Sequence, residues 1–224
     1  MDVFGDPGNV DATVSGFVWI LKLTGASAVL ALVLGVILAA MRVSPIPVLR
    51  LFGAGWVNIF RNTPLTLIIF FCYFGLYSTL GLTLSEDLFR NIYWLGVIGL
   101  ATYTAAFVCE AIRSGINTVP AGQAEAARAI GLTFAQTLRI VVLPQAGRAV
   151  VAPLGSILIA LCKNSTIVGT IGLMESSSVM KDLINSYGNA GILIFAVFAG
   201  AFALLLIPTG YFFGWLANRL AVKR

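Results

Sequence analysis

Five long apolar segments alternate with short polar stretches along the chain. Each exceeds or approaches the roughly 20 residues that an α-helix needs to cross a bilayer. Their apolar positions are continuous rather than alternating, which favours helices over the strands of a barrel. The pattern predicts an all-α integral membrane protein with about five transmembrane helices in a single domain over residues 1–224. The segments run over about 14–41, 52–80, 92–115, 144–172 and 190–217.

The stretch from 113 to 143 lies between the third and fourth apolar segments and is the one substantial polar segment between spans on the side that the charge distribution below assigns to the cytoplasm. Within it, apolar residues recur at steps of three and four, which places them on one face of a helix. These residues are Ala127, Ile130, Phe134, Leu138 and Val141.

A helix stop and a helix start lie inside this polar segment. Gly131 can adopt the left-handed conformation that ends a helix. Thr133 opens the sequence T-F-A-Q, which is a capping box for a new helix. We therefore expect two short helices with a turn at Gly131-Leu132, and Pro144 at the start of the next span.

An amphipathic segment of this kind either lies on the bilayer surface or docks to another protein. Small residues at Ala126, Ala127 and Gly131 suit close packing in a groove, and the apolar stripe is modest for a membrane anchor. The residues alone therefore favour protein docking over surface adsorption.

Composition supports the membrane class. The chain is 59% hydrophobic and 10% charged, with a mean hydropathy of +0.97, whereas soluble domains carry about 25% charged residues. No histidine is present, which excludes catalytic triads and metal sites that depend on histidine. The three cysteines lie in apolar stretches, which favours buried thiols over a disulfide or metal site. The first 13 residues contain three aspartates and no basic residue, so we expect no cleavable signal peptide.

Positive charge is distributed unevenly about the apolar segments. Five crossings place the termini on opposite sides, and an external N-terminus puts ten basic residues on the cytoplasmic side against Arg90 and Lys181 outside. This asymmetry predicts that orientation by the positive-inside rule. The basic residues are spread over membrane flanks, so the basic pI does not indicate nucleic-acid binding. The ten residues are Arg42, Arg50, Arg61, Arg113, Arg128, Arg139, Arg148, Arg219, Lys223 and Arg224.

The polar segment resembles the EAA loop of ABC importer permeases. The resemblance rests on Glu125-Ala126-Ala127, on Gly131 four residues later, and on Leu143-Pro144; Val141 stands where that family usually has isoleucine. The stretches "RNTPLTLIIFFCYFGL" and "ALCKNSTIVGTIG" are similar to the polar amino-acid uptake branch, and "MRVSPIPVLR" and "RSGINTV" to glutamate importer permeases of actinobacteria.

The resemblance implies a bacterial plasma-membrane permease subunit that provides half of the path for a polar L-amino acid, with glutamate favoured over glutamine, aspartate or arginine. It implies a cytoplasmic ABC ATPase dimer, a second homologous permease or a second copy, and an extracytoplasmic amino-acid-binding protein as partners. ATP and magnesium would bind the ATPase, and this chain would hold no cofactor and catalyse no reaction. The residues implied in ATPase coupling are Glu125, Ala126, Ala127, Gly131, Leu132 and Pro144.

Two polar breaks within the apolar segments are candidates for the substrate path. One comprises Lys163, Asn164, Ser165 and Thr166, and the other comprises Arg61, Asn62 and Thr63 before Pro64. Charged groups and free backbone amides at such breaks can bind a carboxylate. The alternative is that the breaks only cap helices or join subunits.

Glu110 is a further candidate within the third span. It precedes Arg113 by three residues, so an intrahelical ion pair makes a structural role more fitting than a substrate contact. Lys22 in the first span is expected to pack or to extend toward the interface.

The alternative from another class of transporter is a carrier driven by an ion gradient. No G-x-x-x-x-G-K-[ST] sequence is present, so this chain has no P-loop, and uphill transport would need another chain or an ion gradient. A carrier driven by an ion gradient usually shows internal repeats with paired broken helices, and no such repeat is apparent.

Overall fold

The structure is a computed structural model that describes residues 3–220, and every regular element in that range is a helix. Lys223 and Arg224, which count toward the charge asymmetry, lie outside the described residues. The elements are α1 (Pro7–Val43), α2 (Pro47–Asn62), α3 (Leu65–Phe70), π-helix η1 (Phe71–Thr79), α4 (Leu88–Asn117), α5 (Ala121–Ala129), α6 (Phe134–Gln136), π-helix η2 (Thr137–Val142), α7 (Leu143–Ala149), α8 (Val151–Asn164), 3₁₀ helix η3 (Ser165–Ile171), α9 (Ser176–Ser186), 3₁₀ helix η4 (Gly188–Ala190) and α10 (Gly191–Leu220).

Within residues 3–220, four stretches are long and apolar enough to cross a membrane: α1, α4, Val151–Ile171 and Gly188–Leu220. The second predicted span is not straight. Pro47–Asn62 and Leu65–Thr79 meet at a bend of 105°, and they satisfy the same criterion only as a pair. Four to five candidate spans therefore agree with the predicted number, the fifth being the bent pair.

The bend follows from the sequence at the α2–α3 junction. Thr63 ends α2 in an extended conformation (φ −99°, ψ 130°), as expected for a residue that precedes proline. Pro64 has φ −56° and ψ 132° and supplies no backbone donor to α2. The chain therefore turns at Thr63-Pro64 before α3 begins.

The long helices α1 and α4 pack closely against each other. A methyl group on Gly35 of α1 would overlap the Val108 side chain of α4, so the absence of a side chain permits this approach. The principal core joins these helices to α3, α8 and η3. Its buried members are Leu23, Leu65, Ile69, Ile92, Val97, Leu100, Leu161, Val168, Ile171 and Leu173.

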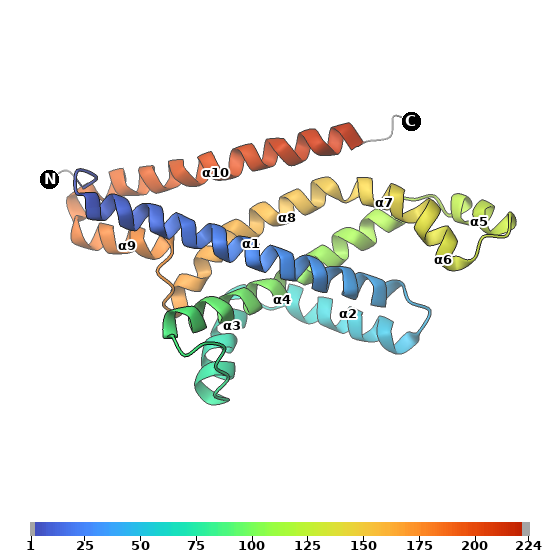
Figure 1. Ribbon diagram of the computed structural model, residues 1–224, viewed down its shortest axis with the longest axis horizontal. Coiled ribbons are helices and arrows are strands. Elements are labelled where there is room, and N and C mark those ends of the chain that lie inside the picture. Colours follow the sequence, from blue (N-terminus) through green and yellow to red (C-terminus); the bar gives the residue numbers. More distant parts are fainter. Residues whose placement is uncertain (1–2, 221–224) are drawn as a thin grey trace.

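The molecule has two distinct ends (Figure 1). The start of α1 lies beside α9 at one end, whereas α5 and α6 project from the other. The helix α10 runs along the outside of the bundle and packs on α8 and α9. The polar segment between the third and fourth spans is thus at the far end from the first described residues.

The connection between the fourth and fifth apolar segments contains a helix that the apolar pattern does not predict. Residues 173–189 include the amphipathic helix α9. Its first residues are the serines Ser176–Ser178, and the side chain of Glu175 caps it by accepting hydrogen bonds from the Ser177 and Ser178 amides. Glutamate is not among the preferred N-cap residues, so the start of this helix has no usual capping signal.

Candidate functional site

The turn at Gly131 ends α5 in the predicted manner. Gly131 has φ +92°, in the left-handed region. Its amide donates to the Arg128 carbonyl (2.9 Å), and the Leu132 amide donates to the Ala127 carbonyl (3.1 Å). These two bonds form a Schellman motif, which satisfies the last carbonyls of the helix.

The following helix starts as predicted. The Thr133 hydroxyl accepts from the Gln136 amide (3.3 Å), and Gln136 Oε1 accepts from the Thr133 amide (2.9 Å), which completes the capping box. Leu143 and Pro144 then open α7, which continues directly from η2 and has the proline in its first turn.

The apolar stripe expected on one helical face is divided by this turn. Ala127 is buried, whereas Ile130 is 81% exposed and Phe134 is 63% exposed. The left-handed residue between the two helices changes the chain direction, so a period of 3.6 residues no longer relates their faces. Glu125, Ala126 and Gly131 are also exposed, so α5, the turn and α6 form a polar surface with two projecting apolar side chains.

The same segment is tied to the spans at its base. Gln145 Nε2 in α7 donates to Gln123 Oε1 in α5 (2.5 Å) and to the Val141 carbonyl (3.0 Å). A methyl group on Gly115, near the end of α4, would overlap Val150 and lie 3.0 Å from the Ala146 carbonyl. A force on α5 can therefore reach both α4 and α7 through direct contacts.

The first polar break uses most of its polar groups locally. Asn62 Nδ2 donates to the Asn58 carbonyl (2.7 Å), and the Thr63 hydroxyl donates to the Ile59 carbonyl (2.8 Å). The Arg61 side chain is 47% exposed, and its guanidinium carbon lies 5.8 Å from the centre of the Phe107 ring. Arg61 is thus the member of this break that offers an exposed positive charge.

The second break coincides with the change from α8 to the 3₁₀ helix η3. Ser165 is fully buried and donates to the Cys162 carbonyl (2.7 Å), and the Thr166 hydroxyl donates to the Lys163 carbonyl (2.8 Å). Both hydroxyls therefore cap the broken helix. Lys163 is exposed, and Asn164 is partly exposed.

Glu110 lies in a cluster with three arginines. It is 3.6 Å from Arg113, which confirms the intrahelical pair, and 3.9 Å from Arg61. It also accepts a hydrogen bond from Arg42 of α1, a partner that the sequence did not reveal because 68 positions separate the two residues. Glu110 thus joins α1, α2 and α4, and the cluster carries two surplus positive charges.

A pocket of about 240 Å³ brings parts of the two breaks near each other. It lies between α4 and α8, and its polar lining comes from Tyr103, Thr104, Ser156 and Asn164. Phe107 also lines it, with Arg61 on that ring. Sequence reasoning missed Tyr103, Phe107 and Ser156; the only available signal was a polar or aromatic residue within an apolar run.

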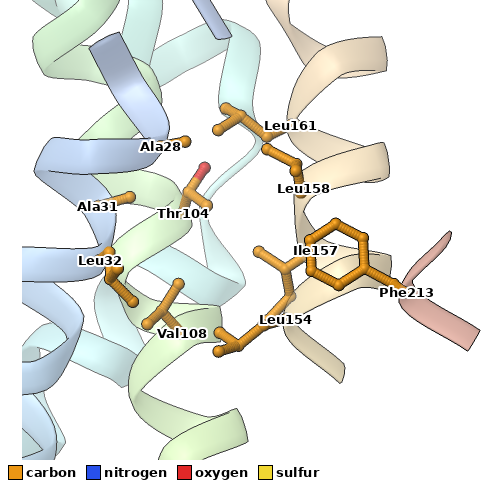
Figure 2. Close-up of a pocket in the computed structure, with 10 residues that line it drawn as sticks. All are labelled: Ala28, Ala31, Leu32, Thr104, Val108, Leu154, Ile157, Leu158, Leu161 and Phe213. Carbon is orange, nitrogen blue, oxygen red and sulfur yellow. The ribbon is translucent and has the colours of Figure 1, made fainter. Parts of the chain in front are cut away.

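A second pocket, of about 210 Å³, is almost wholly apolar (Figure 2). It lies between α1, α4, α8 and α10, and Phe213 of α10 stands at its edge. The Thr104 hydroxyl is its one side-chain polar group, so it offers little to a zwitterion with several charges. We therefore assign no substrate contact to this pocket.

The remaining candidate residues have structural surroundings. Lys22 Nζ lies 4.4 Å from the centre of the Trp19 ring, in agreement with a packed lysine. Cys72, Cys109 and Cys162 are free and buried. Among the described residues, no group of three or more cysteine or carboxylate side chains is placed to hold a metal ion.

Comparison with known proteins relates this architecture to a family. Residues 31–222 match the family model described as binding-protein-dependent transport system inner membrane component. The glutamate transport system permease protein GluC of Corynebacterium glutamicum is 50% identical over 212 residues, covering 92% of this chain and 93% of that protein. The probable glutamine ABC transporter permease protein GlnM of Bacillus subtilis is 37% identical over 188 residues, covering 84% and 83%.

Solved structures agree with these relatives. The fold matches a chain from the crystal structure of an amino acid ABC transporter with histidines, with a TM-score of 0.86, 27% identity, and coverage of 98% of this chain and 99% of that one. A chain of the MetNI methionine ABC transporter in an inward-facing conformation shares the fold, with a TM-score of 0.76 and 21% identity. The chain belongs to the family of inner-membrane components of binding-protein-dependent transport systems.

Proposed function

We propose that this chain forms half of the translocation path of an ATP-driven importer and that its substrate is L-glutamate. The observation that carries the proposal is the 50% identity, over 92% of the chain, to a protein named as a glutamate transport permease. The other half of the path is a second homologous permease or a second copy of this chain, and an extracytoplasmic binding protein delivers the amino acid.

The surface formed by α5, the Gly131 turn and α6 is the proposed contact with the ATPase dimer. Ile130 and Phe134 project from it, and large apolar side chains in the centre of an interface contribute most to binding. Arg128 and Arg139 flank them and are exposed, whereas Glu125 is the one acidic residue over 113–143. The complementary ATPase groove would therefore combine apolar pockets with acidic residues.

The proposed substrate path follows the α4–α8 pocket and the two polar breaks. Glutamate carries two carboxylates and one ammonium group, so it needs hydrogen-bond donors and positive charge. Arg61 supplies a guanidinium whose pairing with Glu110 is long, and Asn164 supplies an amide at the pocket. Lys163, one position away on α8, is exposed and adds a second positive charge to the proposed path.

The test is transport by the reconstituted complex in liposomes, with the binding protein outside and ATP inside. We expect labelled glutamate uptake that requires internal ATP and persists when ionophores collapse ion gradients. Excess unlabelled glutamate should compete fully, and aspartate, glutamine and arginine should compete less. Uptake that continues without ATP and stops with ionophores would assign the protein to the carriers driven by ion gradients. Stronger competition by another of these amino acids would replace glutamate as the substrate.

A further inference from the structure

A buried carboxylate lies where η3 meets α9. Glu175 is completely buried, although it precedes a surface helix at the end of the molecule beside the first residues of α1 (Figure 1). Every salt bridge found among residues 3–220 involves Glu110, so Glu175 has no ion-pair partner there. A carboxylate removed from water without a cation requires dense hydrogen bonding, and its neighbours supply it.

Two serines provide four donors to this carboxylate. The Ser177 amide donates to Oε2 (2.8 Å), and the Ser178 amide donates to Oε1 (3.1 Å). The Ser177 and Ser178 hydroxyls lie 2.5 and 3.2 Å from Oε1. The first turn of α9 is thus wrapped around the Glu175 side chain.

The serine hydroxyls also reach back toward the polar break. Ser177 Oγ lies 3.4 Å from the carbonyl oxygen of Thr166, and Ser178 Oγ lies 3.1 Å from that of Leu173. Thr166 is the last residue of the break that begins at Lys163, and it belongs to η3. Each hydroxyl has one proton to donate, and that of Ser177 goes to the nearer Glu175, so the Glu175–Ser177 pair holds α9 against the backbone of the proposed substrate path by close packing.

Glycine residues allow this close approach from two sides. A methyl group on Gly169 of η3 would lie 2.5 Å from both Glu175 Oε1 and Ser178 Oγ. A methyl group on Gly16 of α1 would lie 2.9 Å from the Ser176 Cα atom. The carboxylate cluster therefore packs closely against η3 at Gly169, and α9 packs closely against α1 at Gly16.

We propose that Glu175 is a positioning residue that fixes the polar break at Lys163–Thr166 for transport, acting through Ser177 and η3. It touches no substrate. Without its acceptor oxygens, the two serine amides and hydroxyls lose their shared partner, and η3 is free to move relative to α9. This inference rests on the proposed function, because the break is assigned there to the substrate path.

The chemistry predicts that the hydrogen-bond acceptor matters more than the charge. In a Glu175→Gln variant with its side-chain oxygen at the Oε1 position, the bonds from the Ser178 amide and from both serine hydroxyls are kept. Only the Ser177 amide loses its acceptor, because the NH₂ group stands at the Oε2 position. Glu175→Met has a similar length and offers none of these bonds.

The experiment measures, for the assembled complex in liposomes, amino acid taken up per ATP hydrolysed. The labelled amino acid is the one that the wild-type complex carries, so a substrate other than glutamate would count against the proposed function and leave this test intact. We expect Glu175→Met to lower the uptake per ATP about tenfold with basal ATPase activity kept, and Glu175→Gln to stay within about threefold of wild type.

Two further variants make the result decisive. Asp87 is the exposed N-cap of α4 and accepts a hydrogen bond from the Arg90 amide. The Asp87→Met variant removes this acidic cap and should leave uptake per ATP unchanged. Gly169→Ala presses on the cluster with Glu175 in place and should act like Glu175→Met. An assembled Glu175→Met or Gly169→Ala complex with wild-type coupling would overturn the proposal. If neither variant complex assembles, the cluster is needed for folding and the proposal is overturned as well. The proposal is also overturned if Glu175→Gln is as impaired as Glu175→Met.

Discussion

Gly131 is a single residue whose backbone conformation sets the geometry of the proposed ATPase contact. No atom would lie within 4 Å of a methyl group at this position, so crowding does not require a glycine there. The requirement comes from the backbone, because φ of Gly131 is +92°. We expect Gly131→Ala to cost about 1 kcal/mol in the left-handed conformation and to shift α6 relative to α5. Less amino acid should be transported per ATP, or the ATPase should dissociate, while the spans still insert.

Gly147→Ala is the matched control for that prediction. Gly147 in α7 is also open to solvent, but it has no positive φ. ATPase retention on co-purification and uptake per ATP should be unchanged in this variant. Normal coupled transport by Gly131→Ala would remove the turn from the docking role.

Lys163 tests whether this half of the path touches the substrate. It is exposed on α8, and its hydroxyl-bearing neighbours already bond to helix carbonyls, so its ammonium group is the free cation of that break. We expect Lys163→Met to lower glutamate uptake about tenfold or more, while assembly and basal ATPase activity persist, because it loses a charged contact but keeps its length.

The control is Lys22→Met, which neutralises an in-span lysine that lies over Trp19. Its uptake should match wild type. If an assembled Lys163→Met complex also matches wild type, the substrate carboxylates are bound by the partner permease, and this chain forms a wall of the path.

The helices α8 and α10 meet at one tight contact. A methyl group on Gly155 would overlap the Phe213 side chain, which also stands at the edge of the apolar pocket in Figure 2. Gly155→Ala should therefore push α10 outward and cost about 1–3 kcal/mol of stability. Thermal denaturation of the purified complex, followed by tryptophan fluorescence, should show a lower midpoint. Gly200→Ala on α10, where a methyl group meets no atom within 4 Å, should leave the midpoint unchanged, and equal midpoints for both variants would contradict the fit.

Elements with strong local signals could be predicted from the sequence. The five apolar segments, the Gly131 turn and the Thr133 capping box depend on nearby residues, and each appears in the structure. The helix α9 and the 105° angle at Pro64 were not predicted. A proline indicates a break but not its angle, and a helix of 11 residues capped by a buried glutamate depends on tertiary packing for its stability.

In the candidate sites too, contacts between residues close in sequence could be predicted, and contacts between distant residues could not. The Glu110–Arg113 pair follows from a spacing of three residues, whereas Arg42 reaches Glu110 only because α1 packs on α4. Likewise, Lys163–Thr166 were identified as a polar break, but only the fold shows that Ser165 and Thr166 are occupied as caps and that Tyr103 and Asn164 share a pocket. Contacts between distant segments need the register of helix packing, which a single sequence does not contain.

At the scale of the whole molecule, the two ends differ in chemistry. The end with α9 carries Lys181 and Asp182, whereas the end with α5 and α6 carries the exposed Arg128 and Ile130. This arrangement, with ten basic residues on one side against two on the other, favours an external N-terminus. The proposed docking surface then faces the cytoplasm, where ATP is available.

Cysteine labelling in intact cells can test that orientation with low background, because the native thiols Cys72, Cys109 and Cys162 are all buried. Lys181 on α9 and Pro45 between α1 and α2 are exposed and lie on opposite sides of the proposed membrane. An impermeant maleimide should label Lys181→Cys in intact cells and Pro45→Cys only after permeabilisation, and it should not label wild type. Labelling of Pro45→Cys from outside, with Lys181→Cys protected, would invert the topology. The Gly131 surface would then face away from ATP, so this result would refute ATPase docking as well as the orientation.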